Sequence, residues 1–185
     1  MMPLDRDTNS MKVSKADLDG VLVIEPKAFR DSRGIFYESY SGKKYEEYGI
    51  PNHFVQDNHS VSTQGTVRGL HYQVNPGQAK LVRVTRGEVF DVVVDIQKNS
   101  PTRGKWWGTR LSETNYLQLY IPVGFAHGFC VLSESAEFLY KCSDYYSPEN
   151  ERGIIWNDPD LAIDWPAEQP ILSKKDQTHP RFRDI

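Results

Sequence analysis

The chain has 185 residues, of which 38% are hydrophobic and 25% are charged, and its formal net charge is −3 at pH 7. This length is sufficient for a sizeable core, and we expect residues 1–185 to form a single domain. The small net charge excludes the bulk basic field that recruits nucleic acid or a membrane surface, although a local basic pocket for a small anion is compatible with it.

The chain begins with a polar stretch, residues 1–11, which lacks the apolar segment of a signal peptide and is expected to form a flexible tail. The longest apolar run, residues 89–96, is interrupted by two aspartates, so we predict no membrane span. Cys130 and Cys142 fall in apolar runs and indicate buried thiols in a reducing compartment, with a disulfide or a reactive thiol as the less favoured alternatives. These features predict a cytoplasmic protein.

Short runs of β-branched and aromatic residues recur along the chain, separated by turn sequences such as DSRG, NPGQ and SPEN. Their spacing predicts an antiparallel sandwich or barrel, and no alternation of strands and helices of the Rossmann type is present. One short helix is expected over 41–49, and the Pro-rich part from Pro159 onward is expected to be irregular and to wrap over the body. The predicted strands are 21–25, 35–40, 53–58, 66–73, 79–85, 88–97, 105–111, 117–122, 126–132, 136–146 and 153–156.

Strand alternation places three titratable side chains among mostly apolar neighbours. The predicted shared faces are Lys80 with Val82 and Val84, His71 with Val67 and Gln73, and Tyr140 with Phe138 and Cys142. Because alternate side chains point to the same side of a sheet, all three titratable groups should face the interior. For any one of them a satisfied internal polar group is the simpler interpretation, but the three together favour a site inside the barrel.

These three residue types suit one kind of chemistry. His71 can act as a general base near neutral pH, Lys80 can stabilise a developing oxyanion, and Tyr140 can return a proton. Together they suit removal of a proton next to a carbonyl group, followed by reprotonation.

Two arginines add the forked donors that suit a diphosphate, namely Arg33 in DSRG and Arg68 in VRGLH. Strict alternation places Arg68 and His71 on opposite faces of their strand. Gly69 between them can permit a bulge that re-aims Arg68; without it, Arg68 would be a structural ion-pair residue.

A metal site is the first role to consider for histidines in a β-barrel. The stretch 121–129, IPVGFAHGF, resembles a metal-binding strand of the cupins. The first cupin motif should then carry His-x-His and an acidic ligand, but position 73 is Gln, and Lys80 stands near the place of the acid. Because only His71 and His127 remain, we expect no catalytic metal and no cofactor.

From about Val21 to Pro180, the chain resembles the dTDP-4-dehydrorhamnose 3,5-epimerase family of cupin enzymes. PVGFAHG alone would indicate only a cupin, whereas the motifs in the family's order are specific. They are IEPKAFRDSRGIFYES, FVQDNHS, VRGLHYQ, KLVRVTRGEVFDVVVDI, IPVGFAHGF, EFLYKCSDYYSP, RGIIWNDPDLAIDWP and ILSKKD. The resemblance implies an all-β cupin jelly roll, a sandwich or barrel with a few short peripheral helices. It also implies a homodimer that acts on a dTDP-sugar.

The resemblance implies a role for each catalytic residue. His71 removes the protons at C3 and C5 of dTDP-4-dehydro-6-deoxy-D-glucose, with Asp176 of LSKKD as its carboxylate partner. Lys80 stabilises the enolate, and Tyr140 reprotonates from the opposite face, which gives dTDP-4-dehydro-L-rhamnose.

A second group of residues is implied to bind the substrate. In this group the ring of Tyr146 stacks on thymine, His127 lines the sugar pocket, and Arg33 reaches the site of the partner subunit. The implied binding residues are Arg33, Glu38, Gln56, Asn58, Arg68, His127 and Tyr146.

Other functions remain open at this point. An enzyme of the same type can act only at C5, or only at C3, of another dTDP-4-keto-deoxysugar, because the choice depends on the placement of the acid tyrosine. A cupin that binds a sugar without catalysis would lack an ordered His–Asp pair. A metal-dependent cupin oxygenase would contain stoichiometric metal.

Overall fold

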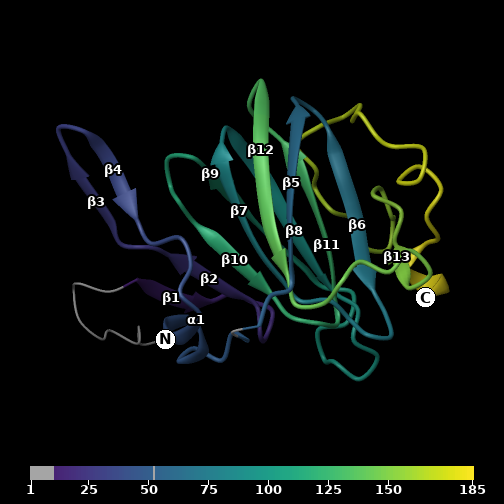
Figure 1. Cartoon of the computed structure of the whole chain (residues 1–185). Coiled ribbons are helices and arrows are strands. Elements are labelled where there is room, and N and C mark those ends of the chain that lie inside the picture. The colour runs from purple at the N-terminus through teal and green to yellow at the C-terminus, as the bar shows by residue number, and fades with distance from the viewer. Residues whose placement is uncertain (1–10, 52) are drawn as a thin grey trace.

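The structure, a computed structural model, describes residues 11–51 and 53–185 of the chain. Two antiparallel β-sheets pack against each other, and a separate two-stranded hairpin projects from them (Figure 1). This architecture confirms the predicted all-β sandwich. The predicted flexible tail, residues 1–11, lies outside the described residues apart from Met11.

The first sheet has six strands and the second has five. From one edge to the other, the six-stranded sheet contains β1 (Lys12–Lys15), β2 (Leu22–Glu25), β10 (Gln118–Ile121), β7 (Lys80–Arg86), β12 (Ser135–Cys142) and β5 (Gln56–Thr63). In the same way, the five-stranded sheet contains β13 (Glu151–Gly153), β6 (Val67–Gln73), β11 (Phe125–Val131), β8 (Glu88–Asp95) and β9 (Trp106–Ser112). The hairpin pairs β3 (Ala28–Asp31) with β4 (Gly34–Tyr37), and the short helices are α1 (Gly42–Glu46) and η1 (Phe182–Asp184).

Each predicted strand overlaps an observed one, and α1 lies inside the predicted helix 41–49. The last strand was predicted over 153–156, but it ends at Gly153, because the N–H of Ile155 donates to the carbonyl of Pro180 and the chain leaves the sheet. Strands β1 and β3 were not predicted. Their sequences, KVSK and AFRD, are short and largely polar, so they carry no strand pattern of their own. They form strands because β1 pairs with β2 and β3 pairs with β4.

The inner faces of the two sheets form an apolar core that becomes polar at one end. The apolar part includes Val82, Val84, Val89, Val93, Phe125, Phe129 and Phe138, all of which are buried. Continuing along the same strand faces, alternation brings Lys80, Asp91, His127 and Tyr140 to the interior. The sandwich is therefore an apolar scaffold with a cluster of polar side chains at one end of its interior.

Strand β6 contains the bulge that Gly69 was expected to permit. His71 pairs with His127 of β11, while Arg68 pairs with Phe129, so a three-residue step on β6 matches a two-residue step on β11. The extra residue turns Arg68 onto the same face as His71.

The same bulge makes one prediction wrong. Val67 was expected to share a face with His71, but Val67 pairs with Cys130 and packs in a second cluster on the outer face of the five-stranded sheet. Strict alternation holds only where a strand has no extra residue, and the bulge lies between these two positions.

Gly69 is required at the bulge for two reasons. Its φ of +123° is a conformation that residues with a side chain rarely adopt, and an added Cβ would lie 2.6 Å from the Cα of Gly128 on β11. The two glycines therefore allow β6 and β11 to approach closely next to His71 and His127.

The C-terminal part of the chain covers the outer face of the five-stranded sheet, drawn in yellow-green and yellow in Figure 1. Ile154, Leu161 and Trp165 pack there on Val67 and Cys130. The segment then returns to β6, where the N–H of Val67 donates to the carbonyl of residue 171. This path brings residues 173–179 beside β6 and β13. Within the described residues, no helix combines the length and hydropathy needed to cross a membrane.

Candidate active site

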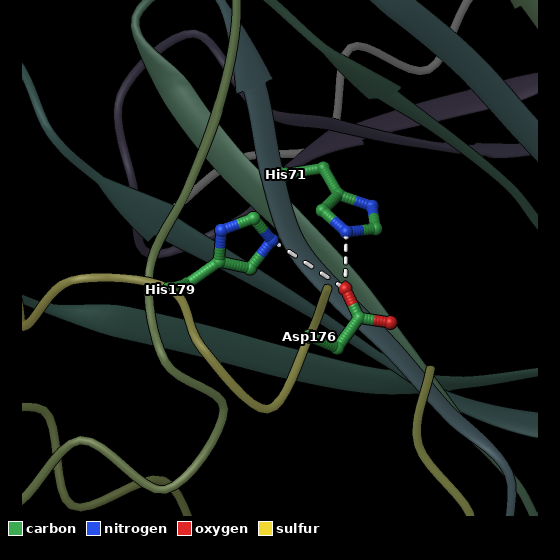
Figure 2. Close-up of side chains that lie close together, drawn as sticks. All are labelled: His71, Asp176 and His179. Atoms are coloured by element: carbon green, nitrogen blue, oxygen red, sulfur yellow. Dashed lines mark hydrogen bonds and ion pairs between the residues drawn. The ribbon is translucent and has the colours of Figure 1, made fainter. Parts of the chain in front are cut away.

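The centre of the site is a contact between His71 of β6 and Asp176 of the C-terminal segment (Figure 2). Nε2 of His71 lies 2.6 Å from Oδ1 of Asp176, although the residues are 105 positions apart in the chain. The Asp176 side chain is buried, whereas that of His71 is 29% exposed. The backbone N–H of Asp176 also donates to Oγ of Ser173, at 3.0 Å, which fixes the turn that carries the carboxylate.

The carboxylate determines which nitrogen of His71 can accept a proton. Burial raises the pKa of Asp176, but the hydrogen bond to His71 and the positive charge of that ring in its protonated form outweigh it, so the pKa lies below its ordinary value. An ionised Asp176 holds the hydrogen on Nε2 of His71, and Figure 2 shows Nδ1 pointing away from the carboxylate. Nδ1 of the neutral ring then carries the free lone pair that a general base needs.

A second histidine contacts the same carboxylate. Nε2 of His179 lies 3.5 Å from Oδ1 of Asp176, and its ring meets that of His71 edge to face at 5.6 Å. Gly153 of β13 leaves room for this ring, because an added Cβ would lie 2.4 Å from Nε2 of His179. Sequence reasoning missed His179, although the D-x-x-H spacing from Asp176 was available as a signal.

Lys80 and Tyr140 lie next to each other on neighbouring strands of the six-stranded sheet. Nζ of Lys80 is 5.9 Å from the centre of the Tyr140 ring. Burial lowers the pKa of Lys80, while the nearby Cys142, Asp91 and Glu151 favour its charged form. Burial raises the pKa of Tyr140, which keeps the phenol protonated at neutral pH. A cation beside a proton donor can stabilise an oxyanion and deliver a proton.

His127 is held by a carboxylate of its own. Its Nε2 lies 2.9 Å from Oδ2 of Asp91, which is completely buried. Burial raises the pKa of Asp91, and the adjacent His127 and Lys80 partly offset this. Since His127 pairs with His71 across the two strands, both side chains lie on the same face of the five-stranded sheet. In the sequence, Asp91 stands out only as an interruption of an apolar run, and that position was the available signal.

A pocket of about 260 Å³ opens beside Tyr140 and is lined also by Gln56, Asn58, Gln78 and Tyr146. The amide of Gln56 donates to Oδ1 of Asn58 at 3.1 Å and accepts from the backbone N–H of Tyr146 at 2.9 Å. The Tyr146 side is open, because this residue is 51% exposed. Sequence reasoning singled out all of these residues except Gln78.

Glu151 connects this pocket to the C-terminal segment. Its carboxylate accepts a hydrogen bond of 2.6 Å from the hydroxyl of Tyr146 and forms an ion pair with Lys175. Burial raises the pKa of Glu151, but these two contacts outweigh it and lower that pKa. Arg68 donates from Nε to Oγ of Ser62 at 3.0 Å, and its positive charge opposes the rise in the Tyr140 pKa.

Of the predicted binding residues, Gln56, Asn58 and Tyr146 line this pocket. Arg68 and His127 lie on the paired strands β6 and β11, and Arg33 and Glu38 lie further away. Arg33 lies in the turn of the β3–β4 hairpin, with its side chain 88% exposed and paired with Asp31 at 2.6 Å. Glu38 follows the hairpin and pairs with Lys44 at 2.8 Å. Figure 1 shows the hairpin standing apart from the sandwich.

Position 73, where a metal-binding cupin would carry a histidine, has a structural role. The Gln73 amide donates to the carbonyls of Pro76 and Tyr145, at 3.3 and 3.1 Å, and its oxygen accepts from the N–H of Ser147 at 2.9 Å. These bonds hold the backbone on both sides of Tyr146.

The sequence and the structure were each compared with known proteins, and both comparisons find enzymes that act on dTDP-sugars. A family model described as dTDP-4-dehydrorhamnose 3,5-epimerase matches residues 15–184. A dTDP-4-dehydrorhamnose 3,5-epimerase from Pseudomonas aeruginosa is 55% identical over 176 residues, which cover 94% of this chain and 97% of that protein. A dTDP-6-deoxy-D-glucose-3,5-epimerase from Legionella pneumophila, solved in complex with dTDP-4-keto-L-rhamnose, is 54% identical with a TM-score of 0.92, covering 95% of this chain and 94% of that one.

A more distant relative has a narrower activity. The structure of a 3'-monoepimerase from Streptomyces bikiniensis, in complex with dTDP-quinovose, is 34% identical with a TM-score of 0.86, covering 91% of this chain and 86% of that one. The family match spans nearly the whole described chain, and the higher identities are to the 3,5-epimerases. The chain therefore belongs to the dTDP-4-dehydrorhamnose 3,5-epimerase family.

Proposed function

We propose that this chain catalyses epimerisation at C3 and C5 of dTDP-4-dehydro-6-deoxy-D-glucose, which gives dTDP-4-dehydro-L-rhamnose. The observation that carries the proposal is the 2.6 Å contact between His71 and Asp176 at the polar end of the sandwich. It is supported by the names of the relatives and by the dTDP-4-keto-L-rhamnose that accompanies one of them.

Each epimerisation is a proton removal followed by a proton return. Nδ1 of His71 takes the proton from the carbon next to the C4 ketone, and the electron pair of the broken C–H bond moves to the C4 oxygen. Lys80 stabilises the resulting enolate. Tyr140 then donates its phenolic proton to the opposite face of the carbon, the ketone re-forms, and both His71 and Tyr140 exchange protons with solvent to return to their starting states.

The nucleotide occupies the pocket beside Tyr140. The half-exposed ring of Tyr146 offers an apolar face for stacking on thymine, and the amides of Gln56 and Asn58 offer polar contacts. Arg68, which the bulge turns toward His71, supplies a forked donor for the diphosphate. His127 lines the sugar pocket.

The protein forms a homodimer in which the β3–β4 hairpin reaches the partner subunit. A two-stranded hairpin alone is marginally stable in water, and this one exposes Phe29 (54%) and Phe36 (72%). A partner that covers these rings would bury apolar area and would also bring Arg33 and Glu38 to a second active site.

The proposal also covers the domain organisation of the chain and its location in the cell. Residues 1–185 act as one domain, and the protein works in the cytoplasm. The location is supported by Cys130 and Cys142, which are both buried and unpaired, as expected in a reducing compartment.

A second candidate is epimerisation at one carbon only. It is favoured by the similarity to a 3'-monoepimerase with the same fold. Proton NMR of the product formed in D2O separates the two functions, because a double epimerase incorporates deuterium at both C3 and C5. Deuterium at a single carbon would establish the monoepimerase.

The proposed reaction is tested by incubating the protein with dTDP-4-keto-6-deoxyglucose, a dTDP-4-dehydrorhamnose reductase and NADPH. We expect oxidation of NADPH and formation of dTDP-rhamnose. Absence of dTDP-rhamnose, with an authentic epimerase active in the same mixture, would overturn the proposal.

A further inference from the structure

Among the described residues, Nε2 of His179 lies beside the proposed base without a hydrogen bond. Its side chain is only 8% exposed, and its Nε2 has no hydrogen-bond partner among the described residues. The nearest acceptor, Oδ1 of Asp176, is 3.5 Å away, outside the usual range of roughly 2.7–3.2 Å for an N–H···O bond. Because an unsatisfied buried nitrogen destabilises the fold, a ligand that used this atom would recover stability.

Three potential ligand atoms converge at this point. Nε2 of His71, Oδ1 of Asp176 and Nε2 of His179 all lie within 4.8 Å of one another, and Figure 2 shows both rings directed at the carboxylate. A tetrahedral Zn²⁺ with bonds of about 2.0–2.1 Å places neighbouring ligand atoms roughly 3.3 Å apart. The 3.5 Å separation between Asp176 and His179 is already close to this value. The 2.6 Å contact between His71 and Asp176 has to lengthen by less than about 1 Å.

The chemistry of the three groups also suits a divalent cation. Two imidazoles and one carboxylate are a common zinc ligand set, with water in the fourth position. The neighbouring cation, Lys175, is paired with Glu151, so its repulsion of a metal ion is reduced.

We propose that His71, Asp176 and His179 form a binding site for a borderline divalent cation such as Zn²⁺, and that an ion bound there stops proton abstraction by His71. The inhibitory part rests on the proposed function, whereas the binding part does not. The site differs from a cupin metal centre, because two of its three ligands come from the C-terminal segment.

The inhibition follows from the tautomers of His71. A neutral imidazole has a single unprotonated nitrogen, so an ion on Nε2 leaves the hydrogen on Nδ1. Nδ1 can then no longer accept a proton from carbon. The ion also engages Asp176, which removes the hydrogen bond that selects the active tautomer.

Binding is tested by equilibrium dialysis of the full chain against Zn²⁺, followed by metal analysis, and by the visible spectrum of added Co²⁺. His179→Gln removes a ligand, and His59→Gln is the matched control, because His59 is an exposed histidine of β5 whose Nε2 lies 3.6 Å from the Glu137 carboxylate. We expect one tightly bound ion per chain, with a tetrahedral Co²⁺ spectrum, in the wild type and the control. In His179→Gln the affinity should fall by more than about 100-fold. His179→Ala, checked for folding by circular dichroism, repeats the test with a smaller side chain.

Inhibition is measured as the turnover of each protein with Zn²⁺ divided by its own turnover with a chelator. The diphosphate of the substrate binds cations by itself, so a loss shared by all proteins reports on the substrate. We expect the loss in the wild type and His59→Gln to exceed that in His179→Gln by more than about tenfold. Equal metal content in wild type and His179→Gln, or no stoichiometric metal in the wild type, would overturn the site. If the wild type has no epimerase activity, the proposed function fails, but dialysis still decides the site.

Discussion

At the scale of single residues, Asp176 links the proposed chemistry to folding stability. Its pKa in the folded protein lies below the ordinary value of about 3.9 for an unfolded chain. A lowered carboxyl pKa stabilises the fold above the unfolded-state value, and this contribution disappears as the pH falls through the folded-state value. The stabilisation is therefore present near neutral pH and is lost in acid.

Asp176→Asn should remove this pH dependence while keeping the shape of the side chain. We expect the free energy of unfolding of the wild type to exceed that of Asp176→Asn at about pH 6, with the difference shrinking below about pH 4. Urea unfolding of both proteins across this range measures the difference. A gap that stays constant down to about pH 3 would contradict the ionised Asp176.

In the proposed reaction His71 removes the proton and Tyr140 returns one, so a mutation can separate the two proton transfers. In Tyr140→Phe the ring remains, but the proton donor is lost. We expect exchange of the abstracted proton with D2O to continue, while product of inverted configuration falls by roughly 10²–10⁴. Proton NMR follows both events in one sample, and loss of exchange together with product would assign Tyr140 a different role.

At the scale of elements, the bulge in β6 positions both Arg68 and His71. Gly69→Ala should destabilise the protein by about 2–4 kcal/mol, because the added Cβ meets the backbone of β11 and the φ is unsuitable for alanine. Urea unfolding measures this change. Gly65→Ala is the control, since Gly65 also has a positive φ, of +76°, but open space around it, and should cost about 1 kcal/mol. Equal losses in the two variants would show that the close approach of β6 and β11 is unimportant.

At the scale of the whole molecule, the exposed hairpin predicts the oligomeric state. Phe36→Glu places a charge on the apolar face of β4, and we expect it to convert the proposed dimer to a monomer and to lower turnover. Light scattering coupled to size-exclusion chromatography gives the mass. Val123→Glu is the control, because Val123 is 51% exposed but lies outside the hairpin. A dimeric Phe36→Glu protein would place the interface elsewhere.

Most strands of the sandwich could be predicted from the sequence, because apolar and polar residues alternate along each of them. The same pattern placed Lys80 and Tyr140 on the inner face. It failed at Val67, because a bulge is a property of two paired strands and one strand's sequence cannot fix it.

The residues of the candidate site were harder to predict from local sequence patterns than the strands were. Asp176 reaches His71 across 105 positions, and only the resemblance to a family indicated that pair. His179 was missed because its role depends on the path of an irregular segment and on the space above Gly153. Arg33 remains apart from the pocket, since a single chain does not contain the surface that it is proposed to meet.

The most direct measurement is the exchange of the H3 and H5 signals of dTDP-4-keto-6-deoxyglucose in D2O, followed by proton NMR with wild type and with His71→Ala. If Nδ1 of His71 is the base, the wild type removes both signals, and His71→Ala slows their loss by roughly 10²–10⁴. Loss of both signals at the wild-type rate in His71→Ala would contradict the assignment of His71 as the base.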